Sequence, residues 1–151
     1  MSLIQDIYSL KMWCTTGNSD KVYHVTIREY VPAGVYDVEV DYGRRGNNLI
    51  RINKASHVSL RKAHEVLNKL KNEKTNKGYQ ITSEVDTSET PEVKWRRRIQ
   101  MAKFRLAKLR DQKVFIEEQY QKLKGMIASD EEETITLAEA IISQKLQVGD
   151  L

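Results

Sequence analysis

The chain has few of the residues that cross-link a protein or carry it across a membrane. Cys14 is its only cysteine, which excludes an internal disulfide and a metal site built from a cysteine cluster. No apolar run approaches the ~18–20 residues that span a bilayer. The first ten residues also lack the basic start and the small-residue cleavage site of a secretory signal. We therefore expect no membrane contact and a reducing compartment: cytoplasmic in a bacterial or phage-infected cell, nuclear in a eukaryote.

Catalytic motifs are also absent from the sequence. It contains no P-loop, dinucleotide fingerprint, nucleophile elbow or His-Glu-x-x-His motif. His24, His57 and His64 show no metal-ligand spacing, and none pairs with a nucleophile or an acid in the sequence. We therefore expect a protein that is not an enzyme and holds neither a metal nor a cofactor. A small enzyme of an unfamiliar type is the distant alternative.

The charged residues are strongly segregated, although the net charge is only +4. Residues 93–124 carry 11 basic and 3 acidic side chains, whereas residues 84–92 carry four acidic side chains and no basic one. Residues 125–151 carry six acidic side chains and one basic one. Such charge blocks give information about binding partners and solubility rather than about the fold. The basic block predicts attraction to a polyanion or to the acidic tail of the same chain.

Residues 1–83 are predicted to form a small α+β domain. Segments 22–30 and 35–42 alternate apolar and polar residues, as half-buried strands do. Shorter strands are predicted over 10–16, 49–53 and 79–85. A helix is predicted over 59–78, where apolar residues recur at three- and four-residue spacing. The expected architecture is a small antiparallel sheet with this helix packed on its apolar face.

The predicted helix has sequence signals at both ends, because Ser59 suits an N-cap and Gly78 suits the position after a C-terminus. Beyond it, the polar and acidic stretch 84–92 is predicted to be a linker between two domains. Pro91, near the end of that stretch, is also compatible with the first turn of a following helix.

Residues 93–151 have a different period. Apolar residues recur every seven positions in two interleaved series, which is typical of a coiled-coil seam on one long helix. The series are Ile99, Leu106, Lys113, Tyr120 and Ile127, and Trp95, Ala102, Leu109, Ile116 and Leu123. Lys113 is the one charged member. The residues expected to mediate oligomerisation are Trp95, Ile99, Leu106, Leu109, Ile116, Tyr120 and Leu123.

A shorter second helix is predicted after this seam. Ser129 and Glu132 match a capping box, and the neighbouring acids suit a helix N-terminus. Gly125 and this capping signal allow a turn near residues 125–130. Two arrangements remain open: the last helix folds back on the long one, or residues 95–127 pair with another chain.

Four features in residues 10–82 together resemble the WGR domain, a family named for a Trp-Gly-Arg motif. The segment 20–27 is similar to the family's Asn-Lys-Phe-Tyr strand, with Lys21 and Tyr23 at the matching places. Residues 42–46, Tyr-Gly-Arg-Arg-Gly, resemble Trp-Gly-Arg-x-Gly, with tyrosine in place of the tryptophan. The apolar helix follows where the family has one, and its end over 74–79 resembles the family's closing Lys…Gly-Tyr.

The resemblance implies a nucleic-acid-binding module, since WGR domains of poly(ADP-ribose) polymerases bind DNA near a break. In those enzymes the motif tryptophan packs on a sugar at the strand end and the arginine contacts the nucleic acid. The positions that correspond here are Tyr42 and Arg44. ADP-ribosylation is not implied, because the catalytic domain of those enzymes has no counterpart in the remaining ~70 residues.

The motif residues also permit plain structural interpretations. Tyr42 is in phase with the apolar side of its predicted strand, so it is either a core residue or a half-exposed aromatic that stacks on a sugar or base. Arg44 and Arg45 lie either in a solvated turn or at a phosphate, which a guanidinium contacts bidentately. Gly43 and Gly46 let the backbone turn tightly and approach a ligand.

We therefore predict a non-catalytic protein that binds DNA or another nucleic acid, at ends or nicks. The predicted contacts are Tyr42, Gly43, Arg44 and Arg45 from the first domain and Lys94, Arg96, Arg97 and Arg98 from the basic helix. The last four residues equally suit ion pairs with the acidic tail, and a basic face is often merely solvated. The alternative function is a protein-interaction adaptor that forms a homo-oligomer, or binds a partner, through residues 95–127.

Overall fold

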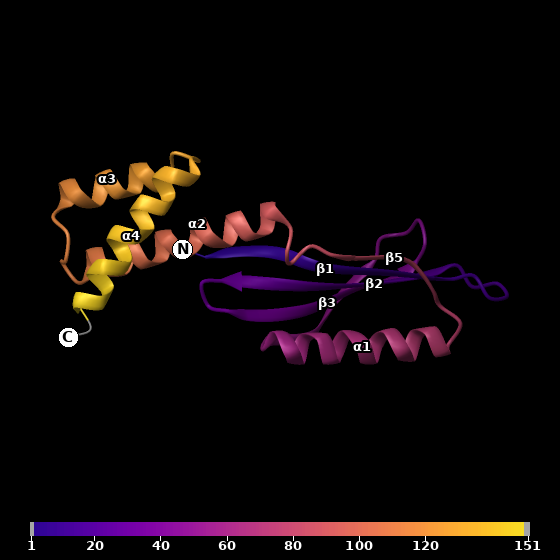
Figure 1. The fold of residues 1–151 in the computed structure, drawn as a ribbon. Coiled ribbons are helices and arrows are strands. Elements are labelled where there is room, and N and C mark those ends of the chain that lie inside the picture. The colour runs from indigo at the N-terminus through magenta and orange to yellow at the C-terminus, as the bar shows by residue number, and fades with distance from the viewer. Residues whose placement is uncertain (1, 150–151) are drawn as a thin grey trace. The chain divides into compact units, whose positions relative to one another are not determined.

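The alternating segments form one antiparallel sheet in the computed structural model, which describes residues 2–149 (Figure 1). The strands are β1 (Leu3–Cys14), β2 (Lys21–Val31), β3 (Val35–Arg44), β4 (Ile50–Val58) and β5 (Gln80–Asp86). Their spatial order is β4-β3-β2-β1-β5, so the first four strands pair consecutively and β5 returns to the free edge of β1. With the helices that follow, the predicted α+β class is confirmed.

The strand register separates an apolar face from a polar one. Val25 of β2 pairs with Val40 of β3, and both are fully buried. Because successive side chains of a strand point to opposite faces, Glu39 and Asp41 lie on the other side of the sheet. There the carboxylate of Asp41 accepts a hydrogen bond from Arg51 Nε at 2.8 Å. The polar face is therefore occupied by cross-strand pairs.

The helix α1 (Leu60–Asn76) packs on the apolar face of β2, β3 and β4. As predicted, Ser59 caps its start, because the Ser59 hydroxyl accepts the backbone N–H of Lys62 at 3.1 Å. The helix ends just before Gly78, whose φ of +98° favours glycine. Its buried residues are Ala63, Leu67 and Leu70.

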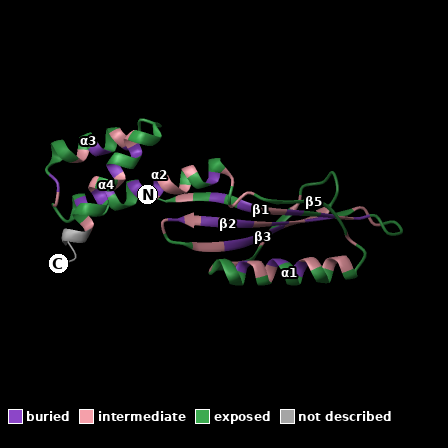
Figure 2. Cartoon of the chain, viewed as in Figure 1, coloured by how far each residue is buried: buried purple, intermediate pink, exposed green. Residues whose placement is uncertain are grey.

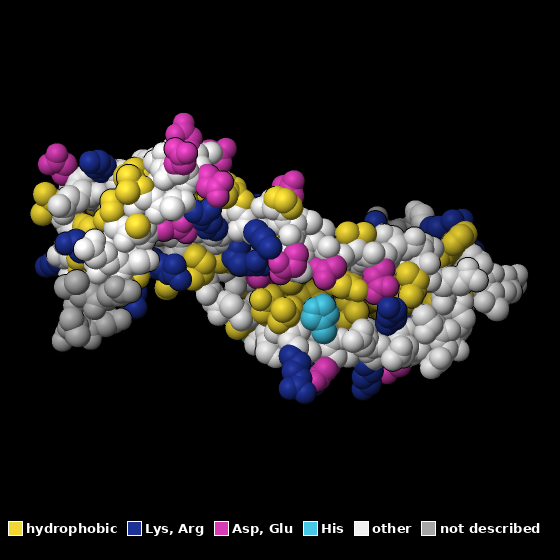
Figure 3. Space-filling view, viewed as in Figure 1, with side chains coloured by type: hydrophobic (Ala, Val, Ile, Leu, Met, Phe, Trp, Pro, Cys, Tyr) yellow, Lys and Arg dark blue, Asp and Glu magenta, His cyan; other side chains and the backbone are white. Residues whose placement is uncertain are grey.

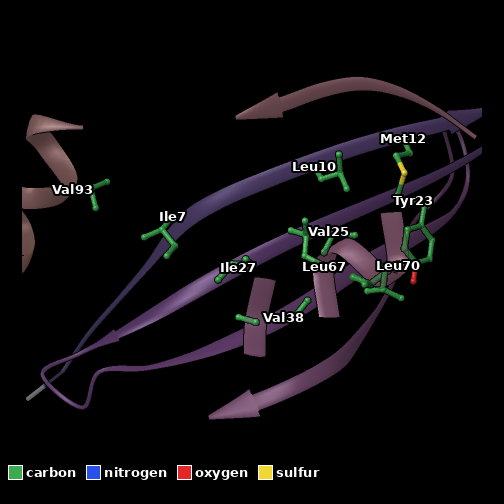
Figure 4. Close-up of a cluster of buried hydrophobic side chains, with 12 residues drawn as sticks. Ile7, Leu10, Met12, Tyr23, Val25, Ile27, Val38, Leu67, Leu70 and Val93 are labelled. Atoms are coloured by element: carbon green, nitrogen blue, oxygen red, sulfur yellow. The ribbon is translucent and has the colours of Figure 1, made fainter. Parts of the chain in front are cut away.

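The core of the first half lies between α1 and the central strands. Buried positions gather on β1, β2 and β3, while the outer side of α1 is exposed (Figure 2). In the close-up of this core, Tyr23 lies at one end, near Met12 and Leu70 (Figure 4). The core thus ends in a tyrosine at the side of the sheet where α1 terminates.

The chain divides into two compact units, Ser2–Lys94 and the residues from Trp95 onward. The predicted linker, residues 84–92, overlaps regular structure at both ends. β5 continues to Asp86 and α2 starts at Pro91, so only residues 87–90 connect the two elements. Proline at the first position of a helix has no N–H to leave unpaired.

The second unit contains α2 (Pro91–Asp111) from Trp95 onward, together with α3 (Glu117–Ile127) and α4 (Glu132–Gly149). It differs from the predicted single long helix, because the heptad series is interrupted at residues 112–116. The cause is a Schellman termination of α2 at the one charged seam position. Lys113 has a φ of +58°, its N–H donates to the Arg110 carbonyl at 2.9 Å, and the Val114 N–H donates to the Leu109 carbonyl at 3.1 Å.

Because of this turn, the heptad seam is buried within the chain. The helical core consists of Ala102, Leu106, Leu109, Phe115, Leu123, Ile127, Ala138 and Ile142. Of the residues predicted for oligomerisation, Leu106, Leu109 and Leu123 are in this core, and Ile99 and Tyr120 pack against it. The Trp95 indole N–H donates to Asp130 at 3.1 Å, whereas the Ile116 side chain is 63% exposed.

Candidate nucleic-acid interface

A pocket of about 570 Å³ opens at the end of the sheet where β2 begins, β3 ends and α1 terminates. Its walls include three tyrosines and three basic residues: Tyr23, Tyr42 and Tyr79, and Lys21, Arg44 and Lys74. The strand register explains the grouping, because Tyr23 pairs with Tyr42 and Lys21 pairs with Arg44 across β2 and β3. The pocket therefore combines aromatic surface with positive charge.

Tyr42 combines the two positions that the sequence left open, since it contacts the core and is also partly exposed. Its ring packs against the core, and the Tyr23 and Tyr42 ring centroids lie 6.3 Å apart with their planes inclined by 37°. It is only partly buried, however, and it also lines the pocket. Tyr42 is therefore held in place by the core while part of its ring remains open to a ligand.

Arg44 and Arg45 differ sharply in their surroundings, although they are adjacent. The Arg44 side chain is exposed, lines the pocket, and has no hydrogen-bond or ion-pair partner within residues 2–149. The Arg45 guanidinium instead lies over the Trp13 ring, 4.3 Å from its centroid. Of the two arginines predicted to bind an anion, only Arg44 is free to do so.

Asp20 completes a clamp around Arg45. Its carboxylate accepts the indole N–H of Trp13 at 2.8 Å and lies 3.2 Å from Arg45 Nε. The Arg45 backbone N–H also donates to the Asp20 carbonyl at 2.8 Å. These contacts join the turn after β3 to the turn between β1 and β2, so Arg45 positions the segment that presents Arg44.

Gly43 connects Tyr42 and Arg44 in a conformation that few other residues adopt. Its φ is +149°, and a Cβ built there would contact the Leu49 side chain at 3.4 Å. A larger residue would be strained by the backbone angle, although its Cβ would make only an ordinary contact with Leu49. Glycine at this position therefore allows the pocket residues Tyr42 and Arg44 to follow each other directly.

Lys74 adds an uncompensated cation from the last turn of α1. Its Nζ lies 4.4 Å from the centroid of the Tyr23 ring, and it forms no ion pair within the described part of the chain. Partial burial lowers the pKa of Lys74, and the nearby cations Lys77 and Lys54 lower that pKa further. A bound anion would favour the charged form of Lys74 and offset the repulsion from these lysines, so the pocket is electrostatically suited to phosphate.

Two of the pocket tyrosines stay protonated at neutral pH. Burial raises the pKa of Tyr23, with a further contribution from Glu73, and burial likewise raises the pKa of Tyr79. Their hydroxyl groups therefore introduce no negative charge beside Arg44 and Lys74.

Lys21, Tyr23, Lys74 and Tyr79 lie in segments that resemble the WGR family, but they were not among the predicted site residues. The signal that could have found them is strand pairing, which sets Lys21 and Tyr23 beside the motif residues. The contribution of α1 depends on how the helix crosses the sheet, which pattern alone does not specify.

A comparison with family models matches residues 8–86, just over half of the chain, to the WGR domain. The chain belongs to the WGR family. This confirms the resemblance seen over residues 10–82, and the Tyr-Gly-Arg at residues 42–44 is this WGR domain's form of the name-giving motif. WGR domains are nucleic-acid-binding modules, which supports a general nucleic-acid-binding role for the chain. No curated protein and no solved structure matches it.

Two of the four basic residues predicted from α2, Lys94 and Arg98, are engaged by acids. Basic and acidic side chains lie among one another on its visible face (Figure 3). Arg98 Nη2 lies 2.6 Å from Glu139 and Arg98 Nη1 lies 3.7 Å from Glu132, both on α4. Lys94 pairs with Glu89 at 2.9 Å, and Arg96 and Arg97 are not free either. The acidic tail thus meets Arg98, one of the two alternatives that the charge pattern allowed.

Three basic residues farther along α2 remain open to an external anion. Lys103, Arg105 and Lys108 are exposed, and none has an ion-pair partner among residues 2–149. Within α2, these residues offer more available positive charge than Lys94 and Arg98, which are already paired with acids.

Other kinds of site are not evident in the described structure. Over residues 2–149, no group of three or more His, Cys, Asp or Glu side chains is arranged to hold a metal ion. No helix in that range is both long enough and apolar enough to cross a membrane.

Proposed function

We propose that this WGR protein binds DNA at strand ends or nicks and that the terminal nucleotide of a strand enters the pocket beside Tyr42. The observation that carries the proposal is the free guanidinium of Arg44 next to a partly exposed aromatic ring. Guanidinium groups match phosphate bidentately, and aromatic rings stack on any base or sugar without selecting a sequence.

The shape of the site favours an end over the middle of a strand. Tyr42 is partly buried, so its ring is accessible only from the pocket. Within a continuous duplex both faces of a base pair are already stacked, and the sugar faces are flanked by neighbours. A strand end leaves one face uncovered, which a recessed ring can reach.

Charge restricts the direction of approach. On the polar face of the sheet, Arg51 is paired with Asp41 and Arg28 with Asp6, so the arginines of that face are already engaged. Arg44, Lys21 and Lys74 lie at the edge around the pocket. The nucleic acid is therefore expected to meet the end of the sheet, with its backbone near α1.

The direct test compares nicked with covalently closed circular DNA in a salt-titrated binding assay. We expect tighter binding to the nicked form and a steep loss of affinity as salt rises. Arg44→Ala should weaken binding to nicked DNA about tenfold and reduce the salt dependence by about one phosphate contact. Arg61→Ala is the matched control, because it removes an arginine whose side chain is 90% exposed at the opposite end of α1.

Equal affinity for the two circles, with Arg44→Ala matching Arg61→Ala, would overturn end recognition at this pocket. Absence of binding to both DNA and RNA at low salt would remove the nucleic-acid role altogether.

The helical unit is proposed to add contacts that do not depend on strand ends. Replacing Lys103, Arg105 and Lys108 together by alanine should weaken binding to nicked and closed DNA by the same factor. This uniform loss is expected because contacts with backbone phosphates carry no information about structure or sequence. A loss confined to nicked DNA would contradict this division of roles.

A protein-interaction adaptor remains the second candidate function because several large apolar side chains of the helical unit are exposed. Phe104 is 45% exposed, Ile116 63% and Leu137 57%. An adaptor of this kind should retain its partner when Arg44 is replaced by alanine, whereas a nucleic-acid complex should not.

A further inference from the structure

The five residues between α2 and α3 contain none of the usual helix-breaking residues. Residues 112–116 are Gln-Lys-Val-Phe-Ile, with no glycine, proline, asparagine or aspartate. The heptad series is also in phase on the two sides, since Leu106 and Tyr120 are separated by two heptads with Lys113 midway. A loop that interrupts a helix pattern normally shifts its phase. The local sequence therefore encodes one continuous helix, and packing imposes the break.

The helix ends on both sides of the break are conformationally unfavourable. α2 stops with Lys113 in the left-handed region, at φ +58°, where glycine is strongly preferred. The N-cap of α3 is Ile116, which has no side-chain oxygen to accept the first N–H groups of the helix, although the Gln119 side chain accepts the Ile116 N–H at 3.4 Å. Ile116 is 63% exposed, although it occupies a seam position. These three costs disappear if residues 112–116 become helical, but the buried Phe115 side chain would then leave the core, because a continuous helix places it outside the seam.

The contacts that hold α2 against α3 and α4 do not require one chain. Leu106 and Leu109 of α2 share a core with Leu123 of α3, and Arg98 of α2 meets Glu139 of α4. If α3 and α4 move together, they can make the same contacts with α2 of another molecule. Exchange of this kind costs association and the exposure of Phe115, because the other contacts of the interface are already built.

We propose that two copies of this chain exchange their α3–α4 segments, with residues 112–116 completing a continuous helix from Pro91 to Ile127. That helix would be about 55 Å long at 1.5 Å per residue. Ile116 returns to the seam, and Lys113 adopts an ordinary helical conformation. The partner is a second copy of the chain, and this inference does not depend on the proposed DNA binding.

Lys113 is the residue at which the two forms are most easily shifted. Lys113→Leu places a helix-forming apolar side chain in the seam and keeps the penalty for the left-handed conformation. It should lower the dimer dissociation constant by at least tenfold. Lys113→Gly removes the penalty in the turn and weakens the continuous helix, so it should raise that constant by about the same factor.

The first measurement is mass by light scattering across the micromolar to millimolar range. We expect the wild-type chain to shift from monomer to dimer with concentration, Lys113→Leu to do so earlier and Lys113→Gly later. Lys122→Leu is the matched control, because it makes the same chemical change at an exposed position of α3 outside the seam. A wild-type chain that stays monomeric throughout, or a Lys122→Leu effect equal to that of Lys113→Leu, overturns the proposal.

The second measurement distinguishes exchange from simple association of intact hairpins. Lys103 and Lys124 line the same groove between α2 and α3. In a continuous helix they are separated by about 32 Å. Spin labels on Lys103→Cys and Lys124→Cys, in a Cys14→Ala background diluted with unlabelled protein, report the distance within one chain. A long distance in the dimer is expected, and a dimer that retains only the short distance contradicts exchange.

Discussion

Removing the Arg45 side chain tests whether this arginine is a structural clamp or a ligand. Arg45→Ala deletes a cation over the Trp13 ring and an ion pair to Asp20. An exposed cation–π contact contributes about 0.5–1 kcal/mol. An exposed ion pair adds about 0.2–1 kcal/mol. We therefore expect the free energy of unfolding to fall by about 1 kcal/mol, a modest effect because the Arg45 side chain is 56% exposed.

The Asp20→Ala variant, at the other end of the ion pair, should lower the free energy of unfolding more than Arg45→Ala does. Asp20→Ala breaks the same ion pair and also leaves the indole N–H of Trp13 without its acceptor at 2.8 Å. A hydrogen bond to a charged group is worth about 1.5–3 kcal/mol, and its loss is partly offset here because water can reach the indole. We expect a total cost of about 2 kcal/mol. The double variant should cost less than the sum of the singles, since both remove one shared contact.

Urea unfolding followed by Trp13 fluorescence in a Trp95→Phe background measures this unit separately from the helical one. DNA binding is measured on the same proteins under conditions in which all remain folded. If Arg45→Ala leaves stability unchanged and weakens nicked-DNA binding as much as Arg44→Ala, Arg45 is itself a ligand and the clamp interpretation is wrong.

Three further outcomes are expected. Tyr42→Trp should strengthen binding to nicked DNA through its larger ring, and Tyr42→Ala should weaken it by about 1–3 kcal/mol in a direct titration. Binding should decline as pH rises, starting at a pH below the usual pKa range of lysine, because burial and neighbouring lysines lower the pKa of Lys74. Lys74→Arg should remove that decline in a pH series. Hydrogen bonds from Tyr8 and Lys71 lower the pKa of Glu84 in the folded protein. Glu84 therefore stabilises the fold above its unfolded-state pKa, and this stabilisation is lost as pH falls through its lower folded-state pKa. Glu84→Gln should flatten the acid side of the stability profile in urea titrations.

Local pattern was sufficient to predict the central strands and the helix because their faces are strictly divided, whereas the predicted strands 10–16 and 49–53 covered only part of β1 and β4. Val25 and Val40 alternate with charged or polar neighbours, so only one register buries the apolar set. Ser59 and Gly78 marked the ends of α1 for equally local reasons, a hydroxyl that accepts an N–H and a backbone that tolerates positive φ.

The site was only partly predictable because it depends on contacts between distant residues. The Trp13–Asp20–Arg45 clamp joins two turns, and nothing in the spacing of these residues distinguishes Arg45 from Arg44. Lys74 reaches the pocket from another element altogether. The strand end, the turn and the last turn of α1 each look ordinary alone, and the geometry of the site arises where they meet.

The helical unit shows how one exception in a pattern can carry structural information. A lysine in a seam is commonly interpreted as a device that specifies register at some cost in stability. Here Lys113 is the residue at which the helix turns, since a charged side chain at that position leaves the turn exposed to water while Val114 and Phe115 continue into the core. Because Lys113 is disfavoured both in the seam and in the left-handed turn, neither form of the unit is strongly favoured at this position. Because Lys113 is unsuited to both, we expect the folded-back form and the exchanged form of the helical unit to lie close in free energy.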